Sequence, residues 1–414
     1  MTSAQGEWVG ESRETDAIRA GTGLRWIGGA LVLAGAFGIT WALWYLLLHP
    51  NGVLKLYTPM YGFSLVAVLA AVLVAMGPGA DGWPFRGWAA PAPVRGLVAT
   101  AAAQALTVAV VHGFFWGFLG RYGVTYFSPQ AIVAAGGVGA EFFNARENAS
   151  TAIVYLSTAF LWTTLGLSLG FGPWPWEASP PGVRAASRLA VAALLAILAY
   201  AVLFHPHVAH LFFPAQTMAG VPPWWADWAQ TGSAYFNLGW VMCAVAVLVV
   251  AEVAWGGAPW RALGGARPWA RGLAALAGSV VAGGALFVVA LRVMTAAWGE
   301  PFQGGQYTDA PYFRYLHAAE VAGFAVLAAF ALDTYLGPAR GAARRALRTL
   351  AIGAATALLH VAYYSDAASR LLGKVPGMAQ PEDTPLVLTL LLLAVVLVQR
   401  ELFGGWPLLA GERG

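Results

Sequence analysis

Long apolar stretches alternate with short polar connections along most of the chain. A membrane-spanning helix needs about 20 mostly apolar residues, and the alternating polar and apolar positions typical of half-buried strands are absent. Helices also satisfy their own backbone hydrogen bonds within lipid. We therefore predict an all-α polytopic membrane protein with about ten transmembrane helices, near residues 26–48, 58–76, 94–118, 149–171, 185–204, 234–256, 268–295, 311–336, 344–364 and 385–403.

The amino-acid composition agrees with this prediction. Of the 414 residues, 59% are hydrophobic and 10% are charged, whereas about 25% of the residues in soluble domains are charged. A water-facing surface of ordinary polarity cannot be built from so few charges, which excludes a soluble enzyme, a disordered chain and a nucleic-acid-binding domain. The single cysteine, Cys243, excludes a disulfide framework and a Cys-rich metal site. The first expected partner is thus the lipid bilayer.

The distribution of Lys and Arg predicts the orientation of the chain. Residues 1–25 are polar, lack the apolar core of a signal peptide and are interpreted as a cytoplasmic tail. Basic residues favour the cytoplasmic side of a membrane. With the N-terminus inside, few of the 23 Lys and Arg residues fall outside, namely Lys55, Arg121, Arg146, Arg292, Arg314, Arg370 and Lys374. We expect both termini in the cytoplasm and the protein in the inner (plasma) membrane.

The spans also repeat along the sequence. Residues 140–147, which open the fourth span, resemble residues 310–317, which open the eighth, and the His-Pro pair at 49–50 matches the pair at 205–206. Because each unit contains an even number of spans, all copies point the same way. Inverted repeats are common in secondary transporters, so a parallel repeat counts against transport. We predict a repeat of four, four and two spans, with boundaries at 26–176, 185–337 and 344–407.

All seven histidines fall on the outer side of this topology, together with many acidic residues. Imidazole and carboxylate groups suit copper, zinc and iron. The leading candidate site comprises Glu300, Asp309, His317 and Glu320, because His317 and Glu320 are three residues apart and share a helix face. Ionisable residues within a span are costly and indicate function. The alternative is that these groups are hydrated near the interface and cap helix ends.

Further candidate residues lie on the same side. His205, His207 and His210 form the densest histidine cluster, although histidines at a helix end need no metal. His112 lies deeper in the third span, either as a core imidazole bonded to a neighbouring carbonyl or as a ligand or gate. At the inner side, Asp333 is expected to reach the interface or to pair with arginines. The remaining polar candidates of the outer side are His49, His360, Asp366, Glu147 and Asn148.

Several segments resemble a known family. Residues 117–129, the fourth span and the Gly-Pro-Trp-Pro turn at 172–175 look like one membrane subunit of the particulate methane/ammonia (copper membrane) monooxygenases. Spans five to ten resemble a second membrane subunit, at Tyr235-Phe236-Asn237, Trp298-Gly299 and His317-Ala-Ala-Glu320.

The resemblance covers most of residues 26–403 and implies copper, partner subunits in the membrane or periplasm, and oxidation of a small apolar substrate. Of the family's copper motif, Asp-x3-His-x12-His, only the last histidine is matched, by His317. Asp309 and Glu300 stand in place of the other two ligands.

The sequence thus leaves three functions open. The first is a membrane metal or redox protein with an outward-facing His/carboxylate site that holds copper, or else iron or zinc. The second is a transporter or channel, against which stand the parallel repeat and the absence of a deep acidic pair. The third is a non-catalytic subunit that scaffolds a membrane oxidase complex.

Overall fold

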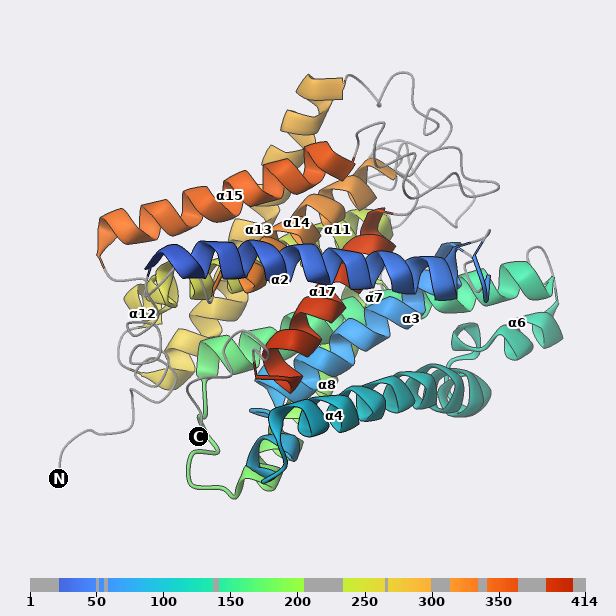
Figure 1. The fold of residues 1–414 in the computed structure, drawn as a ribbon. Coiled ribbons are helices and arrows are strands. Elements are labelled where there is room, and N and C mark those ends of the chain that lie inside the picture. Colours follow the sequence, from blue (N-terminus) through green and yellow to red (C-terminus); the bar gives the residue numbers. More distant parts are fainter. Residues whose placement is uncertain are drawn as a thin grey trace.

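The computed structural model describes residues 22–49, 52–55, 59–136, 141–204, 234–264, 267–298, 313–333, 341–363 and 385–404. Within these ranges the structure is helical and contains no strand, and Figure 1 shows the resulting bundle from the side. Each of the ten predicted spans corresponds to one long helical segment. Helix α7 begins at Phe142, well before the predicted span, because its first turns are polar but already helical.

The long segments form two sets. The first, third, fifth, seventh and ninth segments along the chain, which we call the outer helices, are α2 (Thr22–Leu43) with η1 (Trp44–Leu48), α4 (Ala92–Val108) with η4 (Ala109–Leu119), α8 (Pro181–Leu203), α13 (Pro268–Trp298) and α15 (Ala342–Tyr363). The second, fourth, sixth, eighth and tenth segments, which we call the inner helices, are α3 (Pro59–Val74) with η2 (Ala75–Gly79), α7 (Phe142–Leu165) with η6 (Gly166–Phe171), α11 (Ala234–Trp255), α14 (Phe313–Asp333) and α17 (Pro385–Leu397) with η9 (Val398–Leu402). Short helices lie between them: η3 (Phe85–Gly87), α5 (Gly120–Tyr122), η5 (Thr125–Phe127), α6 (Pro129–Ala135) and α12 (Ala258–Gly264).

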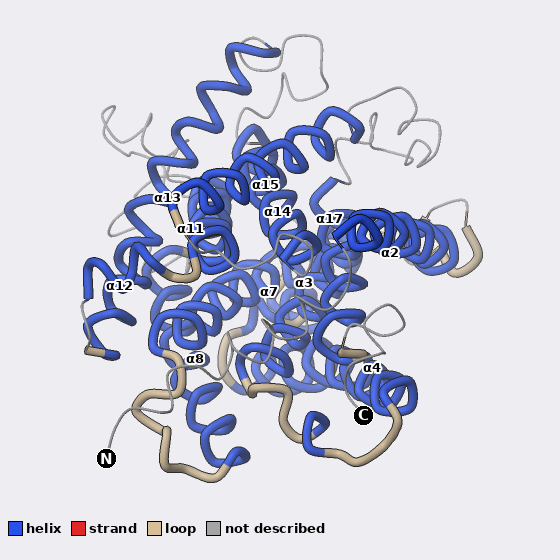
Figure 2. Tube along the Cα trace, turned by 60° about the vertical axis from the view of Figure 1, so that its left-hand side comes forward, coloured by secondary structure: helices blue, strands red, loops and turns tan. Residues whose placement is uncertain are grey.

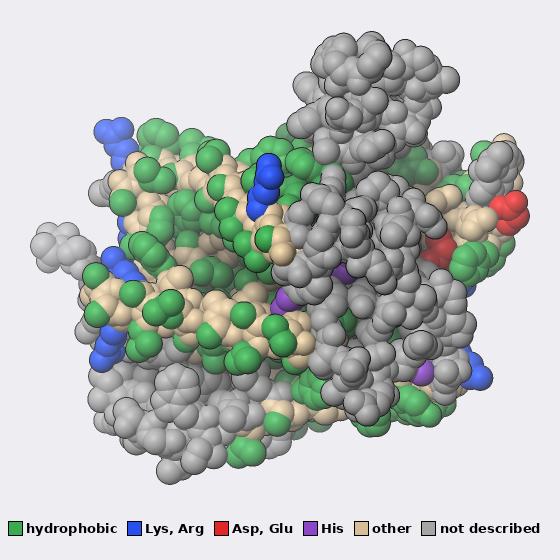
Figure 3. Space-filling model, turned by 90° about the horizontal axis from the view of Figure 1, so that it is seen from above, with side chains coloured by type: hydrophobic (Ala, Val, Ile, Leu, Met, Phe, Trp, Pro, Cys, Tyr) green, Lys and Arg blue, Asp and Glu red, His purple; other side chains and the backbone are tan. Residues whose placement is uncertain are grey.

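Membrane-compatible helices make up most of the bundle. In the described part of the chain, seven stretches are long and apolar enough to cross a membrane: Met60–Gly79, Ala92–Tyr122, Phe142–Phe171, Pro181–Leu203, Phe236–Trp255, Pro268–Met294 and Ala342–Tyr363. Exposed leucines and valines cover the flanks, for example Leu198 on α8, Val281 on α13 and Leu358 on α15. In Figure 3 hydrophobic side chains spread over the described surface, while most visible Lys and Arg lie toward the left-hand end. Such a surface is compatible with a lipid bilayer.

The inner helices form the centre of the bundle. Contacts connect α3 to α7, α7 to α11, α11 to α14, α14 to α17 and α17 back to α3, so the five form a closed inner ring. Figure 2, which looks more nearly along the bundle, places α3, α7 and α14 at its middle. Within an apolar 18-residue window of each of the spans Met60–Gly79, Phe142–Phe171 and Phe236–Trp255, 72% of the residues are buried. In the windows of the four outer spans from α4 to α15, only 22–28% are buried.

The outer helices follow one packing rule around this ring. An outer helix and the inner helix that follows it form a hairpin. Each outer helix contacts the inner helices of the two hairpins that precede it: α8 contacts α7 and η2, α13 contacts α11 and η6, and α15 contacts α14 and α11. The rule closes on itself, because α4 contacts α3 and η9, and α2 contacts α17 and α14. The arrangement therefore repeats a two-helix hairpin, and the predicted grouping into four, four and two spans stays a prediction.

A sequence signal accompanies the two-helix unit. The fourth residue of every outer helix is an arginine: Arg25, Arg95, Arg184, Arg271 and Arg345. All five lie at the end of the bundle where outer helices begin and inner helices finish, which we call the carboxyl end. The opposite end, where the inner helices begin, is called the amino end, and α6 marks it at the right of Figure 1.

Candidate functional site

The predicted pair His317 and Glu320 lies at the amino end on α14. The Nδ1 atom of His317 is 3.4 Å from Oε2 of Glu320, and both side chains are almost fully buried. Phe324 follows on the same helix face, and its ring packs against His360 and Tyr363 of α15. The polar face of α14 is thus turned toward α15.

A third predicted residue joins this pair. His360, in the last turn of α15, interacts electrostatically with both Glu320 and His317. The sequence proposed these residues separately, and the packing of α15 on α14 brings them together. Ala318, Ala319 and Ala322 of α14 are buried beside them, so the group lies in an apolar environment. Ionisable groups in such a place are costly and indicate function.

The geometry of the pair fits two corners of a metal site. Metal–ligand bonds of about 2.0–2.1 Å place neighbouring tetrahedral ligands roughly 3.3–3.4 Å apart, close to the observed separation of 3.4 Å. A structural or catalytic site takes at least three protein ligands. Among the residues that the structure describes, no group of three or more His, Cys, Asp or Glu could hold a metal. The pair therefore supplies two donors, and the described residues do not complete the site.

The other members of the two leading predicted sites lie outside the described residues. These are Glu300 and Asp309, predicted with the pair, and the cluster of His205, His207 and His210. Asp366, three residues beyond the end of α15, is also outside. Their proposed roles as ligands stay predictions.

His112 belongs to a different cluster. Its Nε2 atom is 3.2 Å from the hydroxyl of Tyr61 on α3, and its ring lies edge-on to Trp116 with centroids 4.5 Å apart. The segment that carries His112, α4 with η4, packs on α3, which is not adjacent to α14 in the inner ring. His112 therefore does not join His317 and His360 in one centre.

Glu147 and its neighbours form a helix cap. Oε2 of Glu147 accepts a hydrogen bond of 2.7 Å from the backbone N–H of Met60, at the start of α3. A carboxylate at this position stabilises a helix N-terminus, where unpaired N–H groups and the helix dipole favour negative charge. Arg146 lies beside Glu147 at 3.7 Å, and Asn148 is exposed. The capping alternative thus accounts for Glu147.

His49 has a local structural role. It ends η1, its backbone N–H donates to the carbonyl of Trp44 at 2.7 Å, and its ring lies near the rings of Trp44 and Tyr45. The side chain is buried among these aromatic groups. The contacts of His49 are those of a packed helix end.

At the carboxyl end, arginines join the ends of the inner helices. Arg188 of α8 is 2% exposed and donates to the carbonyls of Pro78, Gly79 and Gly172, and to Asp81. Arg271 of α13 donates similarly to the carbonyl of Gly170 at 2.8 Å. Unpaired carbonyls and the negative dipole end of a helix favour such cations.

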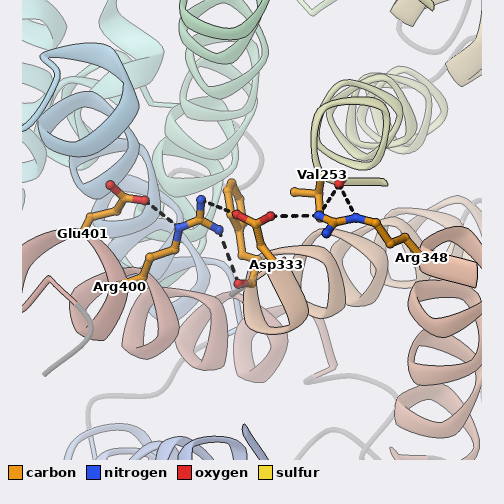
Figure 4. Close-up of polar contacts among 6 residues, drawn as sticks. Val253, Asp333, Arg348, Arg400 and Glu401 are labelled. Atoms are coloured by element: carbon orange, nitrogen blue, oxygen red, sulfur yellow. Dashed lines mark hydrogen bonds and ion pairs between the residues drawn. The ribbon is translucent and has the colours of Figure 1, made fainter. Parts of the chain in front are cut away.

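A second network joins four helical segments, α11, α14, α15 and η9, at the same end (Figure 4). The carboxylate of Asp333, the last residue of α14, lies between Arg348 of α15 at 3.1 Å and Arg400 of η9 at 2.9 Å. Arg348 also donates to the carbonyl of Val253 on α11, and Arg400 pairs with Glu401 at 2.9 Å. Of the two alternatives for Asp333, reaching the interface or pairing with arginines, the structure shows the pairing.

Two titratable groups near the amino end lie outside the membrane-spanning stretches. The side chain of Asn144 donates to Glu141 at 3.0 Å, and this bond lowers the pKa of the Glu141 carboxyl. Burial raises the pKa of the Tyr126 phenol. Glu141 is thus held in its charged form and Tyr126 in its neutral form.

Sequence reasoning missed two sets of residues. Tyr61 was not proposed, because only the packing of η4 on α3 places it beside His112. The arginines of the carboxyl end were counted for orientation but not as helix caps, although one of these caps, Arg271, belongs to the series of arginines at the fourth position of the outer helices.

Comparison with known proteins yields no match: no family model, curated protein or solved structure matches this chain.

Proposed function

We propose that this chain is a multi-pass membrane protein with ten spans and both termini in the cytoplasm. The sorting of basic residues supports this orientation, because Lys and Arg favour the cytoplasmic side. Within the described ranges, the amino end has Lys55, Arg121, Arg146, Arg292 and Arg314. The carboxyl end has more than twice as many: Arg25, Arg86, Arg95, Arg184, Arg188, Arg261, Arg267, Arg271, Arg344, Arg345, Arg348 and Arg400. The amino end then faces outward.

The function that the geometry supports best is binding of a transition metal at this outward end. The observation that carries the proposal is the buried His317–Glu320 pair, whose donor atoms are 3.4 Å apart with His360 of the neighbouring helix in electrostatic range. His317 and Glu320 would hold the ion. Further ligands would come from water or from Glu300, Asp309 and Asp366.

The resemblance noted in the sequence makes copper the first candidate, with iron and zinc as alternatives. Bound copper would supply redox chemistry, and the same resemblance suggests a small apolar substrate and partner subunits. The role of this chain's own residues would be to orient the ion and to exclude water, which the apolar packing around Glu320 favours.

The structure gives less support to an open channel. A water-filled pore along the axis would expose side chains of the inner ring, yet those of Leu73, Ile153, Leu248, Leu327 and Leu397 are almost fully buried. These five positions therefore do not line a water-filled pore.

Metal analysis of the protein purified in detergent tests the proposal. We expect copper, iron or zinc in stoichiometric amount after metal loading, lost in His317→Ala and in Glu320→Gln. His49→Ala is the matched control, because His49 is also a buried histidine of the amino end but is packed among aromatic rings; this variant should keep the metal. A folded wild-type protein that takes up no metal contradicts the proposal, as does full retention in His317→Ala.

A further inference from the structure

The cluster around His112 has a composition different from that of the proposed metal site. It contains a phenol, an imidazole and an indole in mutual contact: Tyr61 of α3, with His112 and Trp116 of η4. The Tyr61 hydroxyl is 3.2 Å from Nε2 of His112, and the Tyr61 and Trp116 rings have centroids 5.7 Å apart. All three side chains are partly buried.

This arrangement suits the removal of an electron from Tyr61 together with its proton. A neutral phenol has a pKa near 10 and becomes strongly acidic once oxidised, so its oxidation at neutral pH is easiest beside a base. In the tautomer with the proton on Nδ1, His112 accepts the Tyr61 O–H bond through Nε2. Imidazole titrates near neutral pH and can take that proton reversibly.

The neighbouring charges favour the coupled path over loss of the electron alone. The guanidinium of Arg146 lies 5.3 Å from the centre of the Tyr61 ring, where it opposes a positively charged ring. Glu147, the nearby carboxylate, already accepts from the backbone of Met60 and is paired with Arg146. His112 is thus the base in direct hydrogen-bond contact with the phenol.

Trp116 extends the path by which the electron leaves. Its ring contacts both Tyr61 and His112, while its buried Nε1 has no hydrogen-bond partner in the described part of the chain. An oxidised Trp116 would keep its proton and take an electron from Tyr61. The positive charge would then lie on the Tyr61–His112 pair, because His112 accepts the proton of the oxidised phenol.

We propose that Tyr61, His112 and Trp116 form a proton-coupled electron relay at the amino end. A one-electron oxidant, by class a high-potential metal complex, receives one electron from Tyr61, directly or through Trp116. The phenol O–H bond breaks, the proton forms an N–H bond at Nε2 of His112, and a neutral tyrosyl radical and an imidazolium remain. Re-reduction reverses each step. The relay does not require a metal at His317.

Flash oxidation tests the proposal in the purified full-length protein. Photo-excited tris(bipyridine)ruthenium with a sacrificial electron acceptor generates the oxidant, and electron paramagnetic resonance identifies the radical at pH 7. We expect a tyrosyl rather than a tryptophanyl signal, most of which is lost in Tyr61→Phe. Tyr122→Phe is the matched control, because Tyr122 is exposed and its ring contacts Arg121 and Phe118 instead of a histidine.

The role of the imidazole is measured separately. His112→Phe should slow radical formation at least severalfold, and the wild-type rate should fall in D2O because the proton moves with the electron. If His112→Phe does not fold, the solvent isotope effect of the wild type decides alone. An undiminished tyrosyl signal in Tyr61→Phe overturns the proposal, and so does a wild-type rate that is the same in H2O and D2O.

Discussion

At the carboxyl end of the bundle, charged side chains connect helices: Arg188 joins the ends of α3 and α7, and Asp333 lies between Arg348 and Arg400. At the amino end, two almost fully buried titratable side chains, His317 and Glu320, are neighbours on one helix and lie within electrostatic range of His360 on α15. Charged side chains that connect different helices stabilise the fold, whereas burying two neighbouring titratable side chains on one apolar helix costs stability. The difference is what we expect if the carboxyl end holds the ring together and the proposed metal site lies at the amino end.

The largest expected effect comes from Arg188→Leu. This change leaves several helix-end carbonyls and Asp81 without their buried cation, so we expect unfolding free energy to fall by about 3–5 kcal/mol. Denaturant unfolding in detergent measures it. Arg184→Leu is the control, because its ion pair with the same Asp81 is partly exposed and should contribute at most about 1 kcal/mol. Equal losses of unfolding free energy in the two variants would contradict the larger contribution expected of Arg188.

A smaller loss is expected for Asp333→Asn. The amide keeps the shape of the side chain but removes the charge between two guanidinium groups, which should cost roughly 1.5–3 kcal/mol. Glu401→Gln provides the comparison, since Glu401 pairs with Arg400 at the edge of the network and should cost less than about 1 kcal/mol. If Asp333→Asn left the unfolding free energy unchanged, the network would contribute little to stability.

At the amino end, Glu320→Gln should behave differently from Asp333→Asn. Replacing a fully buried carboxylate with its neutral isostere removes the cost of burying the charge. In the metal-free protein we expect the unfolding free energy to rise, or to fall by less than about 1 kcal/mol, as is usual for functional residues that are not optimised for stability. A loss as large as that of Asp333→Asn would make Glu320 a structural residue and weaken the comparison.

The smallest effect concerns Glu141 at the start of α7. Because the hydrogen bond from Asn144 lowers the pKa of this carboxyl, its contribution to stability is present above the ordinary Glu pKa of about 4.3 and is lost as the pH falls through the lowered value. Titration of the carboxyl by nuclear magnetic resonance should give a pKa below the ordinary one. Asn144→Ala should raise it, and an unchanged value in that variant would exclude the hydrogen bond as the cause.

The apolar pattern predicted the helices but not their places in the bundle. Apolar 18-residue windows of Met60–Gly79 and Pro181–Leu203 have mean hydropathies of 2.2 and 2.1, yet 72% of the residues are buried in the first window and 22% in the second. In lipid, a helix that faces hydrocarbon and one that faces protein are both apolar, so hydropathy cannot distinguish the inner ring from the outer helices. The recurring arginine at the fourth position of the outer helices carries that information.

The candidate site was predictable only as far as its local spacing. His317 and Glu320 share a face because they are three residues apart on one helix, and that prediction needs no tertiary structure. The approach of His360 depends on the packing of α15 on α14, and the contact of His112 with Tyr61 depends on that of η4 on α3. Contacts between distant helices leave no periodic signal in a single sequence.

The most direct test of a functional amino end is the melting temperature measured with and without a metal chelator. A metal bound only by the folded state raises stability by mass action. The chelator should therefore lower the Tm of the metal-loaded wild type and leave that of His317→Ala unchanged, while Arg188→Leu melts lower but keeps its response to the chelator. A wild-type Tm that is insensitive to the chelator, or an equal decrease in His317→Ala, would contradict the account.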